Sequence, residues 1–311
     1  MSSCLPLGSL SPSELVSASL VLYKTDPIYV YNIVKSFRQS YRAGTLYVID
    51  NSPRKFQIYH FKDPGTVYIK NRRNLGFGVA HNHALKRSRN EGFSHHLLIN
   101  PDVSFDSTTV DLLYHHMQSN PTVGAVMPRV VYPDGELQRL CKLYPSPWDS
   151  LLRLVPWYEK LFPRRTGQYE MHSFDYDQVF RVPLISGCFM MINNKVQETG
   201  IAFDTKYFMY YEDYDLCRRI RQAGYEISFE PAAEIIHDHN RESRRNPVLF
   251  YRHAHSALRY FTKWGWFKDP ERKKVNAGFI QRARSGEESL LKSAALSTLF
   301  IPQQYHEPKG N

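Results

Sequence analysis

Residues 17–52 read SASLVLYKTDPIYVYNIVKSFRQSYRAGTLYVIDNS and contain the first strand–helix–strand unit of the chain. The apolar, β-prone run at 17–23 predicts a buried strand, and the apolar spacing over 29–41 predicts a helix. A second apolar run at 45–49 predicts the next strand. Strands that alternate with helices are typical of a mostly parallel sheet with helices on both faces. The segment therefore predicts an α/β fold.

The same alternation continues along the chain. We expect strands at 66–69, 96–99 and 123–127, helices at 79–90 and 107–119, strand-like segments at 182–192 and 226–229 on either side of an acidic helix, and a late apolar segment at 232–236. Residues 1–14 are rich in Ser, Pro and Leu and are expected to form a loose tail. The pattern thus predicts a single sheet through most of the chain.

The composition is that of a globular protein. The chain has 311 residues, of which 42% are hydrophobic, and it is long enough to bury a sizeable core. No apolar run approaches the length of a membrane span, and the first residues do not form a secretory signal. Cys4, Cys141, Cys188 and Cys217 form no CxxC pair, which argues against a zinc ribbon or a disulfide framework. A reducing cytoplasm fits this pattern.

The charge predicts a polyanionic partner. A net charge of +10 suits nucleic acid, anionic lipid headgroups or phosphorylated substrates, and does not choose among them. Residues 147–165 and 247–268 mix aromatic and aliphatic side chains with Arg and Lys, as in helices that lie in a membrane interface. The alternative is that both stretches are helices packed on the core with a basic outer face.

Polar residues recur where the predicted strands end. Lys-Thr-Asp at 24–26, Asp-Asn-Ser at 50–52, Asn-Pro-Asp at 100–102 and His237 each follow an apolar segment. Ligands of open α/β sheets bind outside the carboxyl ends of the strands, so together these residues predict a binding edge. Asp102 could bind a hard divalent cation, although an Asp in a Pro-containing type I turn is also common. Each motif taken singly also fits an ordinary polar loop.

Two further segments suit an anionic ligand. The glycines of Asn-Leu-Gly-Phe-Gly at 74–78 would let the backbone approach a ligand closely, and Lys70, Arg72 and Arg73 just upstream suit a diphosphate. The alternative is a simple turn that begins a helix. In the stretch from His237 onward, the histidine could ligate a metal and Arg241 could bind a phosphate, unless this is only a solvated charged loop.

The stretch YYEDYDLCRR at 210–219 places three carboxylates, those of Glu212, Asp213 and Asp215, in the first turn of a predicted helix. Exposed backbone N–H groups and the helix dipole favour the ionised form there, so one of them is a candidate general base. Acidic capping of an amphipathic helix is the alternative. The residues alone do not rank the three carboxylates.

Taken together, the order of these motifs resembles glycosyltransferase family 2, especially its bacterial rhamnosyltransferase-like branch. The matching stretches are ASLVLYKTD (18–26), VIDNS (48–52), NRRNLGFGVAHNHAL (71–85), LLINPDV (97–103), LISGCFMMI (184–192), FDTKYFMYYEDYDLCRRIRQAGY (203–225) and IIHDHNRES (235–243). The resemblance implies a Rossmann-like GT-A fold that transfers a sugar with inversion. Its nucleotide-binding half would be 15–125 and its acceptor-binding half 126–245, followed by a helical extension at 246–311.

The resemblance also implies roles for individual residues. Asp213 would deprotonate the acceptor hydroxyl, with Glu212 beside it, and Asp50 would bond the pyrimidine ring. The expected nucleotide-sugar contacts are Tyr23, Thr25, Asp50, Arg72, Asn74, Gly76, Asn100 and Arg241. Asp102 and His237 would bind Mn²⁺ or Mg²⁺, and Gly187 and Asp215 would contact the acceptor. Many relatives carry two aspartates where this chain has Asn100 and Asp102, which leaves strict metal dependence open.

The function implied is transfer of L-rhamnose from dTDP-L-rhamnose to a lipid-linked glycan in surface polysaccharide synthesis, at the cytoplasmic face of the inner membrane and in contact with anionic lipid. A basic nucleic-acid-binding protein is the alternative of another class. It lacks an RNP motif, zinc-finger spacing and a helix-turn-helix, and the strand-end carboxylates would repel phosphate, so no nucleic acid is expected. A scaffold that binds sugar nucleotide without turnover is a third reading. The oligomeric state stays open.

Overall fold

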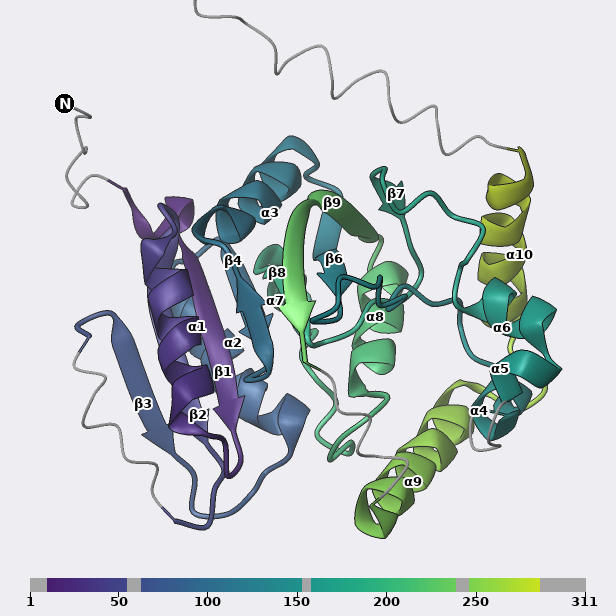
Figure 1. Cartoon of the computed structure of the whole chain (residues 1–311), viewed down its shortest axis with the longest axis horizontal. Helices are drawn as coiled ribbons and strands as arrows, with labels where there is room; N and C mark the ends of the chain where they lie inside the picture. The colour runs from purple at the N-terminus through teal and green to yellow at the C-terminus, as the bar shows by residue number, and fades with distance from the viewer. Residues whose placement is uncertain (1–9, 55–62, 153–157, 239–245, 286–311) are drawn as a thin grey trace, which may run out of the picture.

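In the computed structural model, which describes residues 10–54, 63–152, 158–238 and 246–285, the strands form one mixed sheet (Figure 1). Its strands are β1 (Val16–Leu22), β2 (Ala43–Asp50), β3 (Thr66–Lys70), β4 (His95–Ile99), β5 (Val103–Phe105), β6 (Val123–Val131), β7 (Phe180–Arg181), β8 (Phe189–Asn193) and β9 (Glu226–His237). Their order is β3-β2-β1-β4-β8-β6-β9-β5, and β7 pairs with β9.

The sheet is parallel through β3, β2, β1 and β4, and again between β6 and β9. Strand β8 runs antiparallel to both β4 and β6, and so joins two parallel portions. Strands β5 and β7 pair antiparallel with β9. The prediction of a mostly parallel sheet is confirmed, and β8 is its main interruption.

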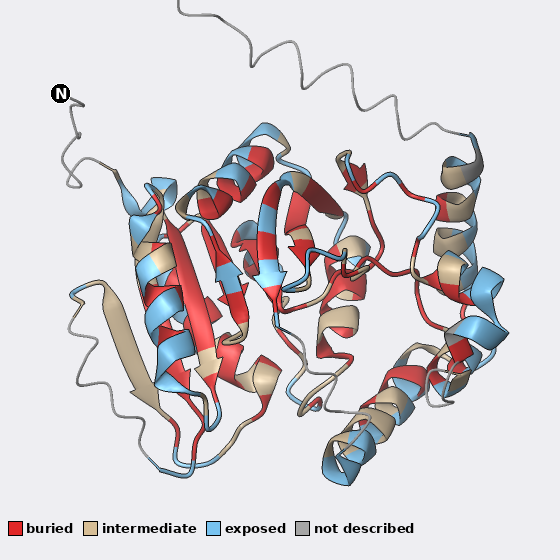
Figure 2. Cartoon of the chain, viewed as in Figure 1, coloured by how far each residue is buried: buried red, intermediate tan, exposed pale blue. Residues whose placement is uncertain are grey.

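Some helices cover the two faces of the sheet, and others lie beside it (Figure 1). They are α1 (Pro27–Gln39), α2 (Phe77–Asn90), α3 (Ser107–Ser119), α4 (Pro147–Leu152), α5 (Tyr158–Leu161), α6 (Pro163–Tyr169), α7 (Lys195–Glu198), α8 (Glu212–Gln222), α9 (Pro247–Trp264) and α10 (Pro270–Ser285). Along β2, Leu46 and Val48 belong to the core under α1, whereas Tyr47 and Ile49 pack with α2. This alternation puts α1 and α2 on opposite faces, and Figure 2 shows the strands between them buried.

Local sequence explains why these elements form. The Asp26 side chain accepts a hydrogen bond from the backbone N–H of Ile28 at 2.9 Å and Pro27 begins α1, so the helix starts with a polar cap and a residue that needs no donor. Every residue of β4 is buried, as expected for a strand covered on both faces. The elements predicted between 17 and 127 are all confirmed, with bounds shifted by a few residues.

One strand prediction was wrong, and two other predicted segments are parts of the same strand. The run 182–192 is not one strand, because residues 186–188 turn into the cleft described below and β8 begins only at Phe189. Conversely, 226–229 and 232–236 belong to the single strand β9. Pro231 lies inside β9, at the point where the register between β9 and β6 shifts. Because of this shift, the missing N–H of the proline costs no hydrogen bond between the two strands.

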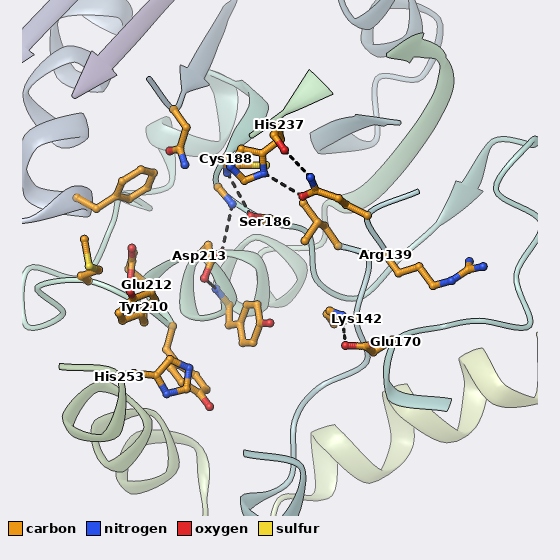
Figure 3. Close-up of a pocket in the computed structure, with 18 of the residues that line it drawn as sticks. Arg139, Lys142, Glu170, Ser186, Cys188, Tyr210, Glu212, Asp213, His237 and His253 are labelled. Atoms are coloured by element: carbon orange, nitrogen blue, oxygen red, sulfur yellow. Dashed lines mark hydrogen bonds and ion pairs between the residues drawn. The ribbon is translucent and has the colours of Figure 1, made fainter. Parts of the chain in front are cut away.

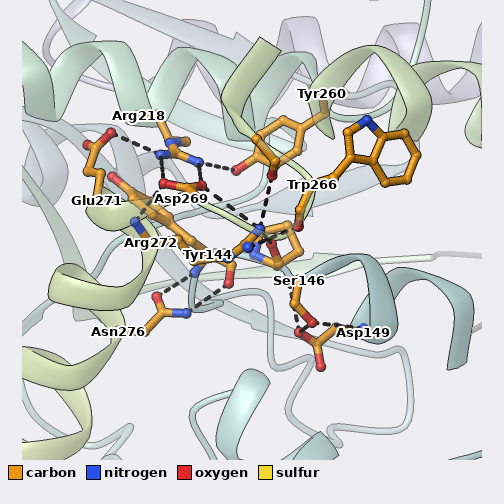
Figure 4. A network of polar contacts seen from close by, with 12 residues as sticks. Tyr144, Ser146, Asp149, Arg218, Tyr260, Trp266, Asp269, Glu271, Arg272 and Asn276 are labelled. Atoms are coloured by element: carbon orange, nitrogen blue, oxygen red, sulfur yellow. Dashed lines mark hydrogen bonds and ion pairs between the residues drawn. The ribbon is translucent and has the colours of Figure 1, made fainter. Parts of the chain in front are cut away.

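A buried ion network fixes α9 and α10 to the rest of the chain (Figure 4). The Arg218 guanidinium on α8 donates to both Asp269 oxygens at 2.7 and 3.0 Å, and to Glu271 at 2.9 Å. It also lies 4.4 Å from the ring centroid of Tyr144 and 4.2 Å from that of Trp264. The C-terminal helices therefore share a buried interior with α8.

Candidate active site

A cleft of about 510 Å³ lies at the carboxyl ends of β4 and β9. Its walls come from Asn100 after β4, His237 at the end of β9, residues 186–188 before β8, residues 209–214 at the start of α8, and parts of the segment 132–142 (Figure 3). These segments are far apart in sequence, and the sheet brings their ends together. Asn100 and His237, from two of the four predicted strand-end motifs, therefore line this cleft.

The two residues before α8 have an unusual backbone conformation. Tyr210 and Tyr211 both have left-handed conformations, with φ of 70° and 63°, which non-glycine residues seldom adopt. Packing holds them there: the Tyr211 hydroxyl lies 2.7 Å from Ser150 Oγ of α4, and its ring centroid is 5.3 Å from those of His253 and Tyr260 of α9. Such strain is typical of functional sites, and here it turns the first residues of α8 into the cleft.

Asp213 is held by backbone groups. Its Oδ2 accepts a hydrogen bond from the Gly187 N–H at 3.2 Å, and its Oδ1 accepts one from the Tyr214 N–H at 2.9 Å. In the described part of the chain no Lys, Arg or His forms an ion pair with it. Burial raises the pKa of the Asp213 carboxyl to about 6. At neutral pH the group is therefore mostly ionised and still able to accept a proton.

Glu212, the neighbour of Asp213, lies in a less polar environment. Its side chain lines the cleft and is buried, and its Oε2 has no hydrogen-bond partner among the described residues. Burial, and then the charge of Asp213, raise the pKa of the Glu212 carboxyl well above its ordinary value. When environments separate two adjacent carboxyls in this way, one holds the proton and the other the charge. This ranks Asp213 above Glu212 as a base.

Asp215 does not reach the cleft, which corrects the expectation that it contacts the acceptor. Its carboxylate is fully buried beneath α9 and is bonded by Arg219 at 2.8 Å, by Lys263 at 2.7 Å and by the Trp264 indole at 2.9 Å. Both oxygens are therefore engaged in holding α8 to α9. Gly187, the other residue expected at the acceptor, does line the cleft, and its N–H donates to Asp213.

Asp102 and His237 lie together, as the sequence predicted for a metal site. The Asp102 Oδ1 is 3.4 Å from the His237 Nε2, and the backbone N–H of Asp238 donates to the Asp102 carbonyl at 2.9 Å. Gln138 was not predicted. Its Oε1 lies 3.1 Å from the His237 Nδ1, and its Nε2 donates to the His237 carbonyl at 2.6 Å. A proton on Nδ1 would bond Gln138 and leave the Nε2 lone pair facing Asp102.

The Asp102–His237 pair fits a divalent cation as part of a ligand set. Two ligand atoms 3.4 Å apart can both reach one ion, since metal–ligand distances are about 2.0–2.2 Å. Over the described ranges, no group of three or more His, Cys, Asp or Glu side chains could hold a metal. The remaining ligands would have to come from a substrate or from water.

At the end of β2, Asp50 is buried and anchored. The Tyr68 hydroxyl donates to its Oδ2 at 2.6 Å, the Ser52 N–H donates to its Oδ1 at 2.8 Å, and Lys70 Nζ is 3.5 Å away. Tyr23 is 48% exposed at the end of β1, and its N–H donates to the Thr25 hydroxyl at 3.2 Å. These residues lie at the strand ends, outside the walls of the cleft.

Gly76 serves a packing role that the sequence did not show. It has φ of 82°, and a Cβ there would lie 2.1 Å from the Phe208 carbonyl oxygen, which accepts a hydrogen bond from the Phe77 N–H at 2.9 Å. The glycine was expected to admit a ligand, and the structure shows that it admits Phe208. Asn74 caps this turn by accepting from the Gly76 N–H at 2.9 Å, whereas Arg72 is exposed.

The structure thus brings part of the predicted site together. Asn100, Gly187, Glu212, Asp213 and His237 line the cleft, and Asp102 adjoins it through His237. The prediction for Arg241 lies outside the described residues. Sequence reasoning missed Gln138, Lys142 and Glu170, which also line the cleft but belong to no recognisable motif.

The sequence matches known glycosyltransferases. The family model for Glycosyl transferase family 2 matches residues 34–195. The chain is 25% identical over 215 residues to an N-acetylglucosaminyl-diphospho-decaprenol L-rhamnosyltransferase of Mycobacterium tuberculosis, covering 68% of this chain and 69% of that one. It is also 36% identical over 79 residues to the rhamnosyltransferase WbbL of Escherichia coli (strain K12), covering 25% of this chain and 30% of that one.

The fold matches as well. The crystal structure of GalNAc-T7 with UDP, GalNAc and Mn²⁺ aligns with a TM-score of 0.58 at 13% identity, over 87% of this chain. This chain spans about half of that one, 51% of its length. The fold is therefore GT-A, as the mixed sheet indicated. Since the family model covers more than half of the sequence, the chain belongs to glycosyltransferase family 2 and is a glycosyltransferase.

Proposed function

We propose that this enzyme transfers L-rhamnose from dTDP-L-rhamnose, with inversion, to the sugar of a lipid-diphosphate-linked acceptor in surface polysaccharide synthesis. The mycobacterial relatives support the transferred sugar and the acceptor class, because they are named as L-rhamnosyltransferases of an N-acetylglucosaminyl-diphospho-decaprenol. The observation that carries the reaction is the half-buried Asp213 carboxylate in the wall of the cleft, held by the Gly187 N–H and lacking an ion-pair partner in the described structure.

The proposed chemistry is a single displacement. An acceptor hydroxyl oxygen attacks the anomeric carbon of the donor sugar while its proton passes to a carboxylate oxygen of Asp213. The bond from that carbon to the diphosphate breaks, and its electron pair leaves with the diphosphate. Attack opposite the leaving group inverts the anomeric configuration. The Gly187 N–H, 3.2 Å from Asp213 Oδ2, keeps the carboxylate oriented for this step.

Asp102 and His237 would hold a divalent cation, Mn²⁺ or Mg²⁺. When bound, such an ion offsets the negative charge that develops on the leaving diphosphate. Gln138 bonds the His237 Nδ1 at 3.1 Å and so orients the ring toward Asp102. With Asn100 where many relatives carry an aspartate, the chain supplies little negative charge of its own, and we expect the cation to bind together with the nucleotide sugar.

The test is a turnover assay with purified protein. We expect dTDP release from dTDP-L-rhamnose in manganese to be slow alone and strongly stimulated by an N-acetylglucosaminyl-diphospho-lipid with a short prenyl chain. Other nucleotide sugars, UDP-glucose among them, serve as controls for the donor. Binding of dTDP-L-rhamnose without turnover would support the non-catalytic scaffold, and neither binding nor turnover with any nucleotide sugar would contradict the proposal.

We also propose that the enzyme binds the anionic cytoplasmic surface of the membrane through α4–α6, α9 and the segment after α9. Large apolar side chains are exposed there: Trp148 by 58%, Leu161 by 63%, Tyr251 by 69% and Phe267 by 79%. Exposed cations accompany them, namely Lys160, Arg164, Arg165 and Lys268. Each basic residue near an anionic leaflet contributes roughly 1 kcal/mol. None of the described helices is long and apolar enough to span a bilayer.

The structure selects the anchors for the membrane test. Trp264 is unsuitable because its indole donates to Asp215 and lies 4.2 Å from the Arg218 guanidinium. We expect Trp148→Ala combined with Phe267→Ala to reduce cosedimentation with anionic vesicles, and Leu112→Ala, an exposed residue on α3, to leave it unchanged. If wild type and variant were recovered equally with anionic and with neutral vesicles, these surfaces would not bind membrane and would be an ordinary basic exterior.

A further inference from the structure

The cleft contains an ion pair that the chemistry above leaves unused. Lys142 Nζ and Glu170 Oε1 lie 2.6 Å apart, and both residues line the cleft. Their side chains are only 6% and 15% exposed. Figure 3 shows the pair apart from the His237 end of the cleft, which adjoins the proposed cation site.

This pair is tied to the turn that carries the base. Lys142 Nζ lies 5.7 Å from the centroid of the Tyr169 ring, and the Tyr169 hydroxyl donates to the Tyr214 hydroxyl at 3.3 Å. Tyr214 directly follows Asp213 in the chain and also lines the cleft. Whatever binds between Asp213 and the ion pair is therefore within reach of the base, and on the side that the donor and cation residues do not occupy.

Fold stability does not account for the pair. Taking two charges out of water costs about as much as their attraction returns, and apolar replacements of buried pairs are often neutral or stabilising. In the wall of a cleft, however, a carboxylate and an ammonium are strong hydrogen-bonding groups. Sugar hydroxyls both donate and accept, so an adjacent acceptor and donor suit two neighbouring ring substituents.

We infer that Lys142 and Glu170 form the subsite for the acceptor saccharide. The Glu170 carboxylate accepts hydrogen bonds from its hydroxyl groups, and the Lys142 ammonium donates to a hydroxyl or acetamido oxygen. His172, whose Nε2 lies 3.3 Å from Glu170 Oε2, steadies the second carboxylate oxygen. The inference rests on the proposed function, because it requires a saccharide acceptor.

Steady-state transfer to the N-acetylglucosaminyl-diphospho-lipid tests the subsite, using the full chain. In Glu170→Gln, which keeps the shape of the side chain, we expect the acceptor KM to rise by about tenfold or more, as charge-assisted bonds become neutral ones. The KM for dTDP-L-rhamnose and its acceptor-independent hydrolysis should stay within about twofold of wild type, because the donor residues lie elsewhere. A purely structural role would not separate the two KM values.

Two further variants keep the test decisive. Glu226→Gln weakens a more exposed ion pair with Arg181, 2.9 Å apart and away from the cleft, and should change neither KM. The double variant Lys142→Met with Glu170→Leu removes both charges without leaving one unpaired, and should fold, bind donor in a thermal-shift assay and lose acceptor affinity. An acceptor KM within twofold of wild type in Glu170→Gln or in the double variant would overturn the inference, as would an equal rise in the donor KM. If wild type transfers to no saccharide acceptor, the proposed function fails instead.

Discussion

Helix α8 carries two charged groups, at Arg218 and at Asp213, whose surroundings differ sharply. Arg218 is surrounded by compensating partners: it bonds Asp269 and Glu271 and lies between the rings of Tyr144 and Trp264. At the start of the same helix, the Asp213 carboxylate accepts hydrogen bonds from the described residues only through backbone N–H groups, and its pKa rises to about 6. The Arg218 charge, which has carboxylate partners, holds α9 and α10 in place. The Asp213 charge has no such partner, so it lowers the stability of the fold but remains available for chemistry.

Breaking the Arg218 network should give the largest effect. Asp269→Ala removes a bidentate partner and leaves a buried guanidinium poorly compensated, which costs about 3–5 kcal/mol of unfolding free energy. Urea denaturation followed by circular dichroism measures the loss. Asp177→Ala, which removes an exposed partner of Arg129, should cost at most about 1 kcal/mol. Equal losses for the two variants would show that the buried network contributes no more than a surface pair.

Removing the base should abolish transfer without harming the fold. Asp213→Asn keeps the shape of the side chain but cannot take the acceptor's proton, so we expect transfer to fall on the order of 100-fold or more. Donor binding, measured by titration calorimetry, should be nearly intact. The matched control is Asp215→Asn, two residues along the helix, which should lower stability while the folded enzyme keeps most of its rate. Transfer by Asp213→Asn within a few fold of wild type would shift the assignment to Glu212.

Disturbing the proposed cation site should have a smaller effect. Asp102→Ala should weaken donor binding in manganese and lower transfer by about tenfold or more, with His237→Ala somewhat milder. Gln138→Ala should act in the same direction because it orients the His237 ring. Titration of manganese into each variant in the presence of dTDP measures the effect. Undiminished wild-type activity in a chelator would remove the cation from the mechanism, even if all three variants were inactive.

The smallest expected effect is the pH dependence of transfer and of stability, which tests whether the Asp213 charge is poorly compensated. The pKa of Asp213 is raised to about 6 from an ordinary 3.8, so transfer should rise with pH through about 6 as the base ionises. The raised pKa of Asp213 also lowers the stability of the fold. Above pH 6 the folded protein carries the full free-energy cost of the desolvated Asp213 charge. Below about pH 3.8 the carboxyl is neutral in both the folded and the unfolded protein, and this cost vanishes. Asp213→Asn should therefore gain Tm over wild type at pH 8 and gain less at pH 5. A gain that does not change with pH would mean that Asp213 is not a destabilising ion.

Much of the fold was predictable because its signals are local. The apolar runs and helical spacing between residues 17 and 127 each report on one element, and the structure confirms them. The break in the run 182–192 could not be predicted from the sequence, because the apolar pattern does not reveal the turn that brings Gly187 to Asp213. Helix geometry separates Asp213 from Asp215: residues two apart lie about 200° apart around a helix, so only one can face the cleft.

The missed site residues depend on pairings between distant segments. Gln138 meets His237 across 99 residues, and Lys142 meets Glu170 across 28. No periodicity or spacing joins such pairs, because the sheet order and not the local sequence decides which strand ends become neighbours. A glutamine and a lysine outside any motif therefore gave no signal before the fold was known.

The close approach of Gly76 to Phe208 has a consequence for motion. The Phe77 N–H bonds the Phe208 carbonyl at 2.9 Å, and the glycine leaves no space between the two backbones. The loop at 74–76 leads into α2, and Phe208 lies five residues before Asp213. We therefore expect a displacement of one backbone to shift the other, so that the loop at 74–76 and the segment leading to Asp213 change position together.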